Sequence, residues 1–244
     1  MQYTKNGTID LSGRQLTEVP PHVWRNHSLR VLNLFRNKLK TLPADIGQIR
    51  SLHVLIVANN KLRALPEELG SLRRLRMLDA GHNKITNLPR SFAQLAALTD
   101  YLYLHDNQLQ ALNDSVFANF AQLRYLNLSD NPLRGLPASL SALIKLEELR
   151  LENIGMEFLP ASIGDLSSLD ELTVRNNRLT SLPDSLEKLS YLRHLDLRGN
   201  RLSRVPNVIR SLPKIQKLDL RWNELRVRPS WLKELGARGC RVLL

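Results

Sequence analysis

The sequence predicts one α/β repeat domain: a right-handed solenoid shaped like a horseshoe. A parallel β-sheet should line its concave face, with short helical, 3-10 or extended segments on its convex face. Three observations predict this fold. An asparagine recurs every 23 or 24 residues, leucines keep fixed positions around it, and aromatic residues are only 5% of the chain, which calls for an aliphatic core. With 244 residues, 43% of them hydrophobic, the chain can bury a continuous core.

The repeat is marked by asparagines that are each followed two residues later by an apolar residue. They are Asn37, Asn60, Asn83, Asn107, Asn131, Asn177, Asn200 and Asn223. Their separations are 23, 23, 24, 24, 46, 23 and 23 residues, and Ile154 stands at the midpoint of the interval of 46. One period before the first asparagine stands Arg14. The sequence therefore predicts ten units, two of which lack the asparagine.

Each unit combines a strand pattern with a return segment. The second unit shows the strand pattern as Leu29, Leu32, Leu34, Asn37 and Leu39. Its return segment reads Leu42, Pro43, Ile46, Gly47 and Ile49. Because side chains alternate between the two faces of a strand, the leucines should enter the core and the residues between them should face outward.

The recurring asparagine should satisfy buried backbone groups. Its amide can both donate and accept where the chain turns inward, so that stacked asparagines form a ladder. At Ile154 the ladder lacks its asparagine. We expect residues 152–158 to be irregular, or to use Asn153 instead.

This pattern resembles the leucine-rich repeat family over nearly the whole chain. The 23-residue form with Leu-Pro is similar to the intracellular class found in Ras-pathway scaffolds, plant intracellular Ras-group-related proteins and bacterial cytoplasmic proteins. The resemblance implies a protein-interaction role, with signalling as one setting and a small GTPase or kinase as one class of partner. It identifies no individual partner.

Two neighbouring units depart from the regular length. Three residues separate Leu98 from Leu102 where two are usual, which predicts a bulge at Thr99 and Asp100. The following unit has an asparagine in place of the proline and carries two phenylalanines, which predicts a bulkier convex side. These residues are Asn113, Phe117 and Phe120.

The ends of a solenoid need caps because they expose the core. We assign residues 1–28 to an N-terminal cap and first unit, 29–227 to the repeats and 228–244 to a C-terminal cap. Residues 8–11 should form an edge strand, residues 229–235 a short amphipathic helix ended by Gly236 and Gly239, and residues 240–244 a last strand. Cys240, the single cysteine, should be a small buried residue.

The composition of the chain indicates its cellular location and the charge of its partners. One cysteine allows no disulfide within the chain, residues 1–7 lack the apolar run of a secretory signal, and the longest apolar run, residues 54–58, falls far short of the roughly 20 residues that span a bilayer. We therefore expect a cytoplasmic protein without membrane insertion. The formal charge of +12 favours partners with an acidic surface.

The fixed register also identifies the side chains that face outward on the concave face. The N-terminal half should present an apolar and aromatic set that includes three of the five tyrosines: Phe35, Ile56, Met77, Tyr101, Tyr103, His105 and Tyr125, with Val31 and Val54 beside them. Rigid tyrosines suit a protein interface, and lateral packing between neighbouring strands is the alternative.

The C-terminal half of this face is charged. Its candidate partner-binding residues are Arg150, Arg175, Arg198, Arg221 and Trp222. The arginines could meet carboxylates or phosphates of a partner, or could pair with neighbouring carboxylates of the chain itself. A basic rim follows the asparagines at Lys38, Lys40, Lys61, Arg63, Lys84, Arg178 and Arg201. It could steer an acidic partner or be an ordinary solvated edge.

Catalysis is not expected. Two histidines lie on neighbouring concave positions with acidic and hydroxyl residues beside them: His82, His105, Asp106, Ser129 and Asp130. An open sheet neither excludes water nor fixes a third group, and efficient acid–base chemistry needs both. The chain also lacks a phosphate-binding glycine loop or a cysteine cluster, so we expect no cofactor and no resident metal.

The sequence therefore predicts a non-catalytic module that binds a partner protein on its concave face. One alternative is a binder of nucleic acid or anionic surfaces through the +12 charge, which the dispersed basic residues disfavour. A second alternative is a secreted bacterial effector that acts by binding a host protein. The oligomeric state stays open.

Overall fold

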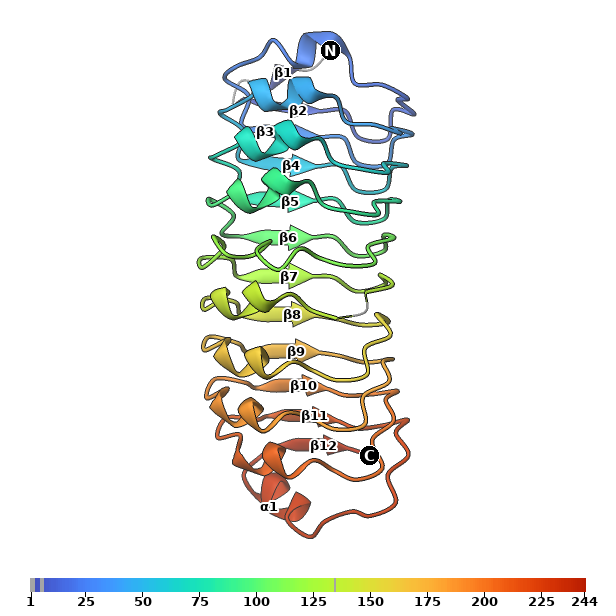
Figure 1. Cartoon of the computed structure of the whole chain (residues 1–244), viewed down its shortest axis with the longest axis vertical. Coiled ribbons are helices and arrows are strands. Elements are labelled where there is room, and N and C mark those ends of the chain that lie inside the picture. The colour runs from blue at the N-terminus through green and yellow to red at the C-terminus, as the bar shows by residue number, and fades with distance from the viewer. Residues whose placement is uncertain (1–2, 5–6, 134) are drawn as a thin grey trace.

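The computed structural model describes residues 3–4, 7–133 and 135–244, which form one elongated stack of coils (Figure 1). Each strand lies beside the next one in the chain, from one end of the stack to the other. The strands are β1 (Tyr3–Thr4), β2 (Thr8–Asp10), β3 (Val31–Asn33), β4 (Val54–Ile56), β5 (Met77–Asp79), β6 (Tyr101–Tyr103), β7 (Tyr125–Asn127), β8 (Glu148–Arg150), β9 (Glu171–Thr173), β10 (His194–Asp196), β11 (Lys217–Asp219) and β12 (Arg241–Leu243). Pairing is parallel from β2 to β12, which confirms the predicted repeat solenoid.

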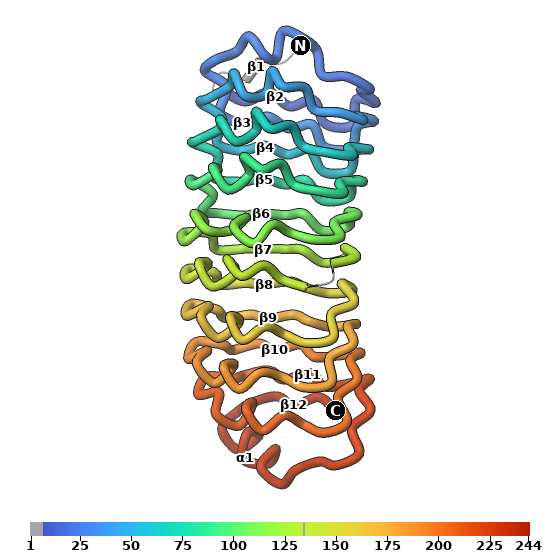
Figure 2. The backbone as a smooth tube through the Cα atoms, viewed as in Figure 1, coloured from blue at the N-terminus to red at the C-terminus, as the bar shows by residue number. Residues whose placement is uncertain are grey.

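The return segments contain short helices, and the backbone repeats a similar coil in successive units (Figure 2). The 3-10 helices are η1 (Pro21–Val23), η2 (Ala44–Gln48), η3 (Glu67–Ser71), η4 (Arg90–Gln94), η5 (Ala138–Ala142), η6 (Ala161–Asp165), η7 (Asp184–Lys188) and η8 (Asn207–Ser211), and α1 (Leu232–Ala237) is α-helical. No helix among the described residues has the length and apolar character needed to cross a bilayer.

The Leu-Pro motif starts each helix from η2 to η7, and Val205-Pro206 takes its place before η8. The proline before the helix is extended, with φ between −73° and −62°, and its carbonyl accepts a hydrogen bond from the third helical residue. In η2 this bond joins Ile46 N to Pro43 O at 3.1 Å, and the Ile46 side chain is fully buried. The glycine of the motif lets adjacent helices approach closely. A Cβ on Gly164 would lie 2.2 Å from Ser185 O in the next unit.

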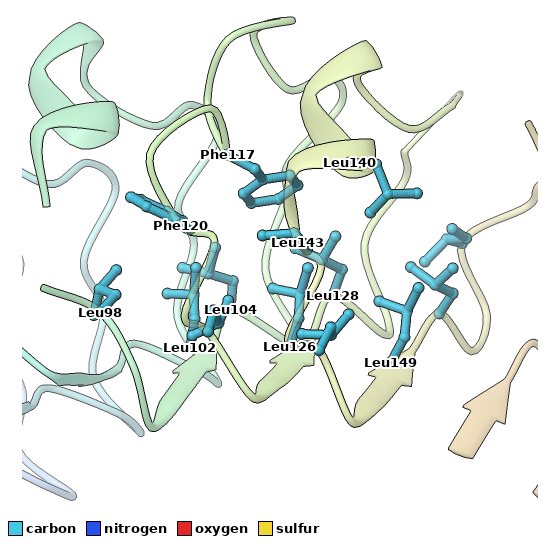
Figure 3. Close-up of a cluster of buried hydrophobic side chains, with 14 of the residues drawn as sticks. Leu98, Leu102, Leu104, Phe117, Phe120, Leu126, Leu128, Leu140, Leu143 and Leu149 are labelled. Atoms are coloured by element: carbon cyan, nitrogen blue, oxygen red, sulfur yellow. The ribbon is translucent and has the colours of Figure 1, made fainter. Parts of the chain in front are cut away.

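The leucines of the strand pattern fill a continuous core. The central residues of β6, β7 and β8 are Leu102, Leu126 and Leu149, and each is at most 1% exposed. Figure 3 shows them pointing from the strands into the interior, beneath Phe117 and Phe120. These phenylalanines are fully buried, their rings lie 6.1 Å apart, and their unit contains a series of turns where the neighbouring units have η4 and η5. The return segment of this unit therefore differs from those of its neighbours, and its two phenylalanines belong to the core.

The asparagine ladder is present. Asn60 is typical: its Nδ2 donates to Leu34 O at 2.9 Å and to Val57 O at 3.0 Å, and its Oδ1 accepts from Leu39 N at 3.0 Å. It thereby joins two neighbouring coils and satisfies backbone groups that water cannot reach. The corresponding bonds recur at Asn37, Asn83, Asn107, Asn131, Asn177, Asn200 and Asn223.

At the gap in the ladder, the expected irregular backbone is present at Gly155, whereas the expected use of Asn153 in the ladder is wrong. Asn153 has the same left-handed backbone as the corresponding residue of most other units, with φ of 54°. Gly155 is left-handed as well, with φ of 75°, and its one counterpart among the described residues is Gln15, in the other unit that lacks the asparagine. The side chain of Asn153 donates to Asp130 on the exposed rim at 2.7 Å and does not enter the ladder.

Ile154 occupies the ladder position and is 2% exposed. Leu133 N, which would donate to the side-chain oxygen of an asparagine at position 154, donates instead to Asn131 O at 2.8 Å.

The extra residue of the fifth unit forms the predicted bulge. Both Thr99 N and Asp100 N donate to Arg76 O, at 3.2 and 3.1 Å. On the other side, Thr99 O and Asp100 O each accept one bond from the next coil, where a regular unit uses a single carbonyl for both. The paired register between β5 and β6 accordingly begins only at Leu78.

The two ends differ from the expectation in detail. Residues 8–11 do not form the edge of the sheet, because β1 pairs with β2 in antiparallel fashion. At the other end α1 continues through Gly236 and stops before Gly239, whose φ is 87°. The last strand is confirmed as β12, parallel to β11, and Cys240 is 5% exposed, as expected for a small core residue. Burial raises the pKa of its thiol.

Candidate partner-binding face

The register of the sheet places the predicted outward residues side by side. Tyr101 pairs with Tyr125, and Tyr103 pairs with Asn127. All members of the N-terminal set are partly exposed, in contrast to the leucines between them: Val31, Phe35, Val54, Ile56, Met77, Tyr101, Tyr103, His105 and Tyr125. The N-terminal half of the concave face is therefore an open surface of apolar and aromatic side chains.

Three tyrosines form a cluster in the middle of this face, which we call the tyrosine cluster. Tyr101 stacks on Tyr125 with ring centroids 4.6 Å apart and an interplanar angle of 19°. Tyr103 lies 5.5 Å from Tyr101 at a tilt of 48°. The lateral packing that the sequence offered as an alternative is thus present. It leaves the rings partly exposed, so packing and contact with a partner are compatible.

A salt bridge supports one edge of the cluster. Arg124 makes two hydrogen bonds to the Glu147 carboxylate, at 2.8 and 2.7 Å, and its guanidinium lies 5.5 Å from the centre of the Tyr125 ring. The Tyr125 hydroxyl donates to Glu147 at 3.3 Å. Burial, then the nearby negative charge of Glu147, raises the pKa of Tyr125. Its hydroxyl therefore remains a protonated donor at neutral pH.

Beside the cluster lies a pair of histidines. His82 Nδ1 donates to Asp106 at 2.6 Å, and the Nε2 atoms of His82 and His105 are 3.2 Å apart. The His105 ring packs directly over Gly81, where a Cβ would come within 2.4 Å of it. Burial, then the adjacent His82, lowers the pKa of His105, so this ring is neutral at pH 7. The sequence predicts that these residues occupy neighbouring positions, but it does not predict the contact between the two rings.

The charged half of the face pairs largely with itself. Arg175 bonds Glu152 at 2.6 Å, Arg198 bonds Asp196 at 2.9 Å, and Arg221 bonds Asp219 at 2.7 Å. Arg150 bonds Glu148. A groove of about 470 Å³ runs between these pairs. Of the two alternatives for the arginines, the structure shows the intramolecular one.

Asp219 is the most enclosed member of this network. Its side chain is 2% exposed, and Arg198 also approaches it, at 3.4 Å. Burial acts to raise the pKa of Asp219, but hydrogen bonds from Arg221 and the charges of both arginines outweigh it and lower the pKa. Trp222 is 72% exposed, with Arg198 and Arg221 at 5.9 and 5.5 Å from its ring.

The basic rim contrasts with this network. In the first four units it comprises Arg36, Lys38, Lys40, Lys61, Arg63 and Lys84, all exposed. Among the described residues, none of these six has a carboxylate within 4.0 Å of its charged nitrogen atoms. Arg36 was missed by the sequence analysis, although it directly precedes Asn37, and its guanidinium lies 6.0 Å from the centre of the Phe35 ring. The rim therefore places unneutralised positive charge beside the apolar half.

The comparisons with known proteins agree with this geometry. A leucine-rich repeat model matches residues 99–153 and 167–225, and a leucine-rich repeat region model matches residues 9–113. No curated protein matches the chain significantly.

Solved structures match it closely. A leucine-rich repeat protein of Leptospira interrogans is 32% identical with a TM-score of 0.89, and the match covers 97% of this chain and 60% of that one. The Toll–Spätzle complex of Drosophila matches with 26% identity and a TM-score of 0.82, over 97% of this chain and 32% of that one. A TDR receptor matches with 26% identity and a TM-score of 0.80, over 89% of this chain and 39% of that one.

The chain thus spans about three-fifths of the Leptospira protein and no more than two-fifths of the other two. Leucine-rich repeat domains commonly serve as non-enzymatic surfaces for protein–protein interaction. The stacked units, the asparagine ladder, the family models and the similar structures agree: the chain belongs to the leucine-rich repeat family.

Proposed function

We propose that the chain is a non-catalytic interaction module that binds an acidic surface of a partner protein with the N-terminal half of its concave face. One observation carries the proposal. Partly exposed apolar and aromatic side chains lie there beside a basic rim that no carboxylate of the described chain neutralises. Apolar area would supply the affinity, and the rim would supply attraction and orientation.

The centre of the proposed site is the tyrosine cluster. Aromatic rings bury a large area, and the stacked pair of Tyr101 and Tyr125 is already fixed by its neighbours, so little side-chain entropy is lost on binding. The remaining contacts of the site are Phe35, Ile56, Met77, Tyr103 and His105. These residues stand on four successive strands or directly after them, which gives a continuous surface.

The charged half has a smaller part in this proposal. A carboxylate of a partner would have to displace Glu152, Asp196 or Asp219 from its arginine. The free energy gained from the new ion pair would then be largely cancelled by the loss of the existing one. Trp222 and the arginine column can therefore extend the interface at its C-terminal edge, without forming its centre.

The relatives support a protein as the occupant. One similar structure is a complex, Toll–Spätzle, and another is a receptor. The likeness to the intracellular Leu-Pro class favours a cytoplasmic setting and makes a small GTPase or kinase with an acidic face a suitable partner class.

Affinity capture from native lysate, followed by mass spectrometry, tests the proposal. The variant Tyr101→Ala/Tyr103→Ala/Tyr125→Ala should lose its partner while its far-ultraviolet circular dichroism stays the same. A matched control replaces three exposed hydrophobic residues outside the concave columns by alanine: Ile144, Phe158 and Tyr191. The control should retain the partner. Undiminished capture by the tyrosine variant would reject the proposed site.

The basic rim also supports a second candidate, the binding of anionic polymers such as RNA. Neutralised phosphates release counterions, so such binding weakens steeply as salt rises. A salt titration against random RNA distinguishes the two candidates. Tight binding that is lost steeply with salt and with Lys38→Glu/Lys61→Glu/Lys84→Glu, but unaffected by the tyrosine changes, would favour the nucleic-acid function.

A further inference from the structure

Two imidazole rings from neighbouring coils converge on one point of the concave face. His82 Nε2 and His105 Nε2 are 3.2 Å apart, and the ring planes are nearly perpendicular, at 82°. Gly81 leaves the space that the His105 ring occupies, since a Cβ there would lie 2.4 Å from it. Two nitrogen ligands of one tetrahedral zinc ion, each about 2.0–2.1 Å from the metal, lie about 3.3 Å apart. The observed separation matches this value.

Asp106 fixes the orientation of one ring. Its carboxylate accepts a 2.6 Å hydrogen bond from His82 Nδ1, which places the proton on Nδ1 and leaves Nε2 with a lone pair. A carboxylate behind a ligating histidine is the usual second support of a metal site, because it sets the tautomer and raises the basicity of the ligand.

The His105 ring has an unused nitrogen. Its Nδ1 is buried and has no hydrogen-bond partner among the described residues, whereas its Nε2 faces His82. In the metal-free pair, one Nε2–H donates to the other Nε2. When a cation takes that place, the proton of His105 moves to Nδ1, and both Nε2 lone pairs are free to bind.

We propose that His82 and His105 bind one divalent transition-metal cation of the Zn²⁺ type through their Nε2 atoms, with Asp106 as the supporting carboxylate. No group of three or more histidine, cysteine or acidic side chains converges on a cation position in the described parts of the chain, so water completes the coordination. Imidazole ligands select Zn²⁺, Cu²⁺ and Ni²⁺ over Mg²⁺ and Ca²⁺. Affinity should be moderate and should rise from Zn²⁺ to Cu²⁺.

This site shares His105 with the proposed protein-binding face and lies next to the tyrosine cluster, but the argument for it does not rest on the protein-binding proposal. The rings of Tyr103 and His105 are 6.1 Å apart. Failure of metal binding therefore leaves the interaction function untouched, and the two are measured in separate experiments.

Isothermal titration calorimetry of the chelator-treated chain with Zn²⁺, and separately with Mg²⁺, tests the proposal. We expect one equivalent of Zn²⁺ and no Mg²⁺ to bind. His82→Gln and His105→Gln should each weaken Zn²⁺ binding at least tenfold, and Asp106→Asn about tenfold. His53→Gln is the matched control, because His53 bonds Ser51 O and lies outside the pair. It should leave the affinity unchanged.

Nuclear magnetic resonance of the unaltered chain gives a result that does not depend on how the variants fold. Addition of Zn²⁺ should shift the Nε2 resonances of His82 and His105 by coordination and leave those of the other four histidines in place. Zn²⁺ binding that survives in a variant carrying both His82→Gln and His105→Gln, or shifts confined to His22, His27, His53 or His194, would overturn the site. Absence of any Zn²⁺ binding by the folded chain would overturn it as well.

Discussion

The ring of Tyr101 stacks on the ring of Tyr125, 4.6 Å away and 19° from parallel, across the boundary between two repeat units. The two residues are direct partners in the parallel register of β6 and β7. A single aromatic surface thus spans neighbouring coils, and its outer side stays partly open. This relationship links the stability of the stack to the surface that we propose for binding.

Two substitutions of Tyr125 should distinguish the contribution of its ring to stability from that of its hydroxyl. Tyr125→Phe keeps the stack and loses only a partly exposed 3.3 Å bond to Glu147, so the free energy of unfolding should change by less than about 0.5 kcal/mol. Tyr125→Ala removes the aromatic pair and should cost about 1–2 kcal/mol. Urea unfolding measures both. An equal cost for the two variants would show that the stack contributes nothing.

The asparagine ladder should contribute to stability at every unit that has it. Asn131 is 1% exposed and bonds Leu104 O, Leu128 O and Leu109 N. Asn131→Ala leaves these groups unpaired, so the unfolding free energy should fall by about 1–3 kcal/mol. The control Asn87→Ala alters an exposed asparagine outside the ladder, whose side chain bonds only its neighbour Thr86 at 3.3 Å, and should change stability much less. Similar losses in both variants would contradict a structural role for the ladder.

The glycines within the 3-10 helices η2, η3 and η6 should tolerate no side chain. Gly164→Ala would place a Cβ 2.2 Å from Ser185 O, and the coils would have to separate, at a cost of about 1–3 kcal/mol. Gly236 provides the opposite case. It lies in α1 with nothing within 4 Å of a Cβ, so Gly236→Ala should stabilise the chain by about 0.5–1 kcal/mol. Thermal unfolding should show a lower melting temperature for Gly164→Ala and a higher one for Gly236→Ala than for the wild type.

Asp219 should make the stability depend on acid pH. Its pKa is lowered from 3.8 in the folded chain, so the folded state binds fewer protons than the unfolded state. The stabilisation is complete above the ordinary pKa and is lost as the pH falls below 3.8 toward the folded pKa. Asp219→Asn should lower the free energy of unfolding by about 1–3 kcal/mol at pH 7, which is less than for a fully buried pair because Arg221 is partly exposed. The variant should also lose less stability than the wild type as the pH falls. Parallel acid profiles of variant and wild type would disprove this role.

Much of the fold follows from the sequence because a repeat fixes its own register. Once Leu32, Asn37 and Pro43 recur every 23 residues, the inward leucine, the ladder amide and the helix start recur with them. The bulge at Thr99 and Asp100 followed from a single extra residue. At the gap around Ile154 the sequence correctly predicted an irregular backbone, which occurs at Gly155, but wrongly offered Asn153 as a substitute, because that side chain bonds Asp130 on the exposed rim.

The site was less predictable. The sequence identified which side chains face outward, but the choice between an arginine that binds and one that is paired depends on side-chain rotamers, as at Arg198 and Asp196. The contact between His82 and His105 likewise depends on Gly81, which leaves space for the ring. The repeat register places these residues on neighbouring strands, but only the three-dimensional packing shows which of their atoms are in contact.

Site-specific photocrosslinking tests the central claim most directly. A photoreactive phenylalanine analogue would be placed at position 103 in the tyrosine cluster, at position 175 in the charged half, or at position 191 outside the concave columns. The account predicts that the captured partner crosslinks several times more strongly from position 103 than from position 175, and not above background from position 191. The strongest crosslink from position 175 or 191 would contradict it.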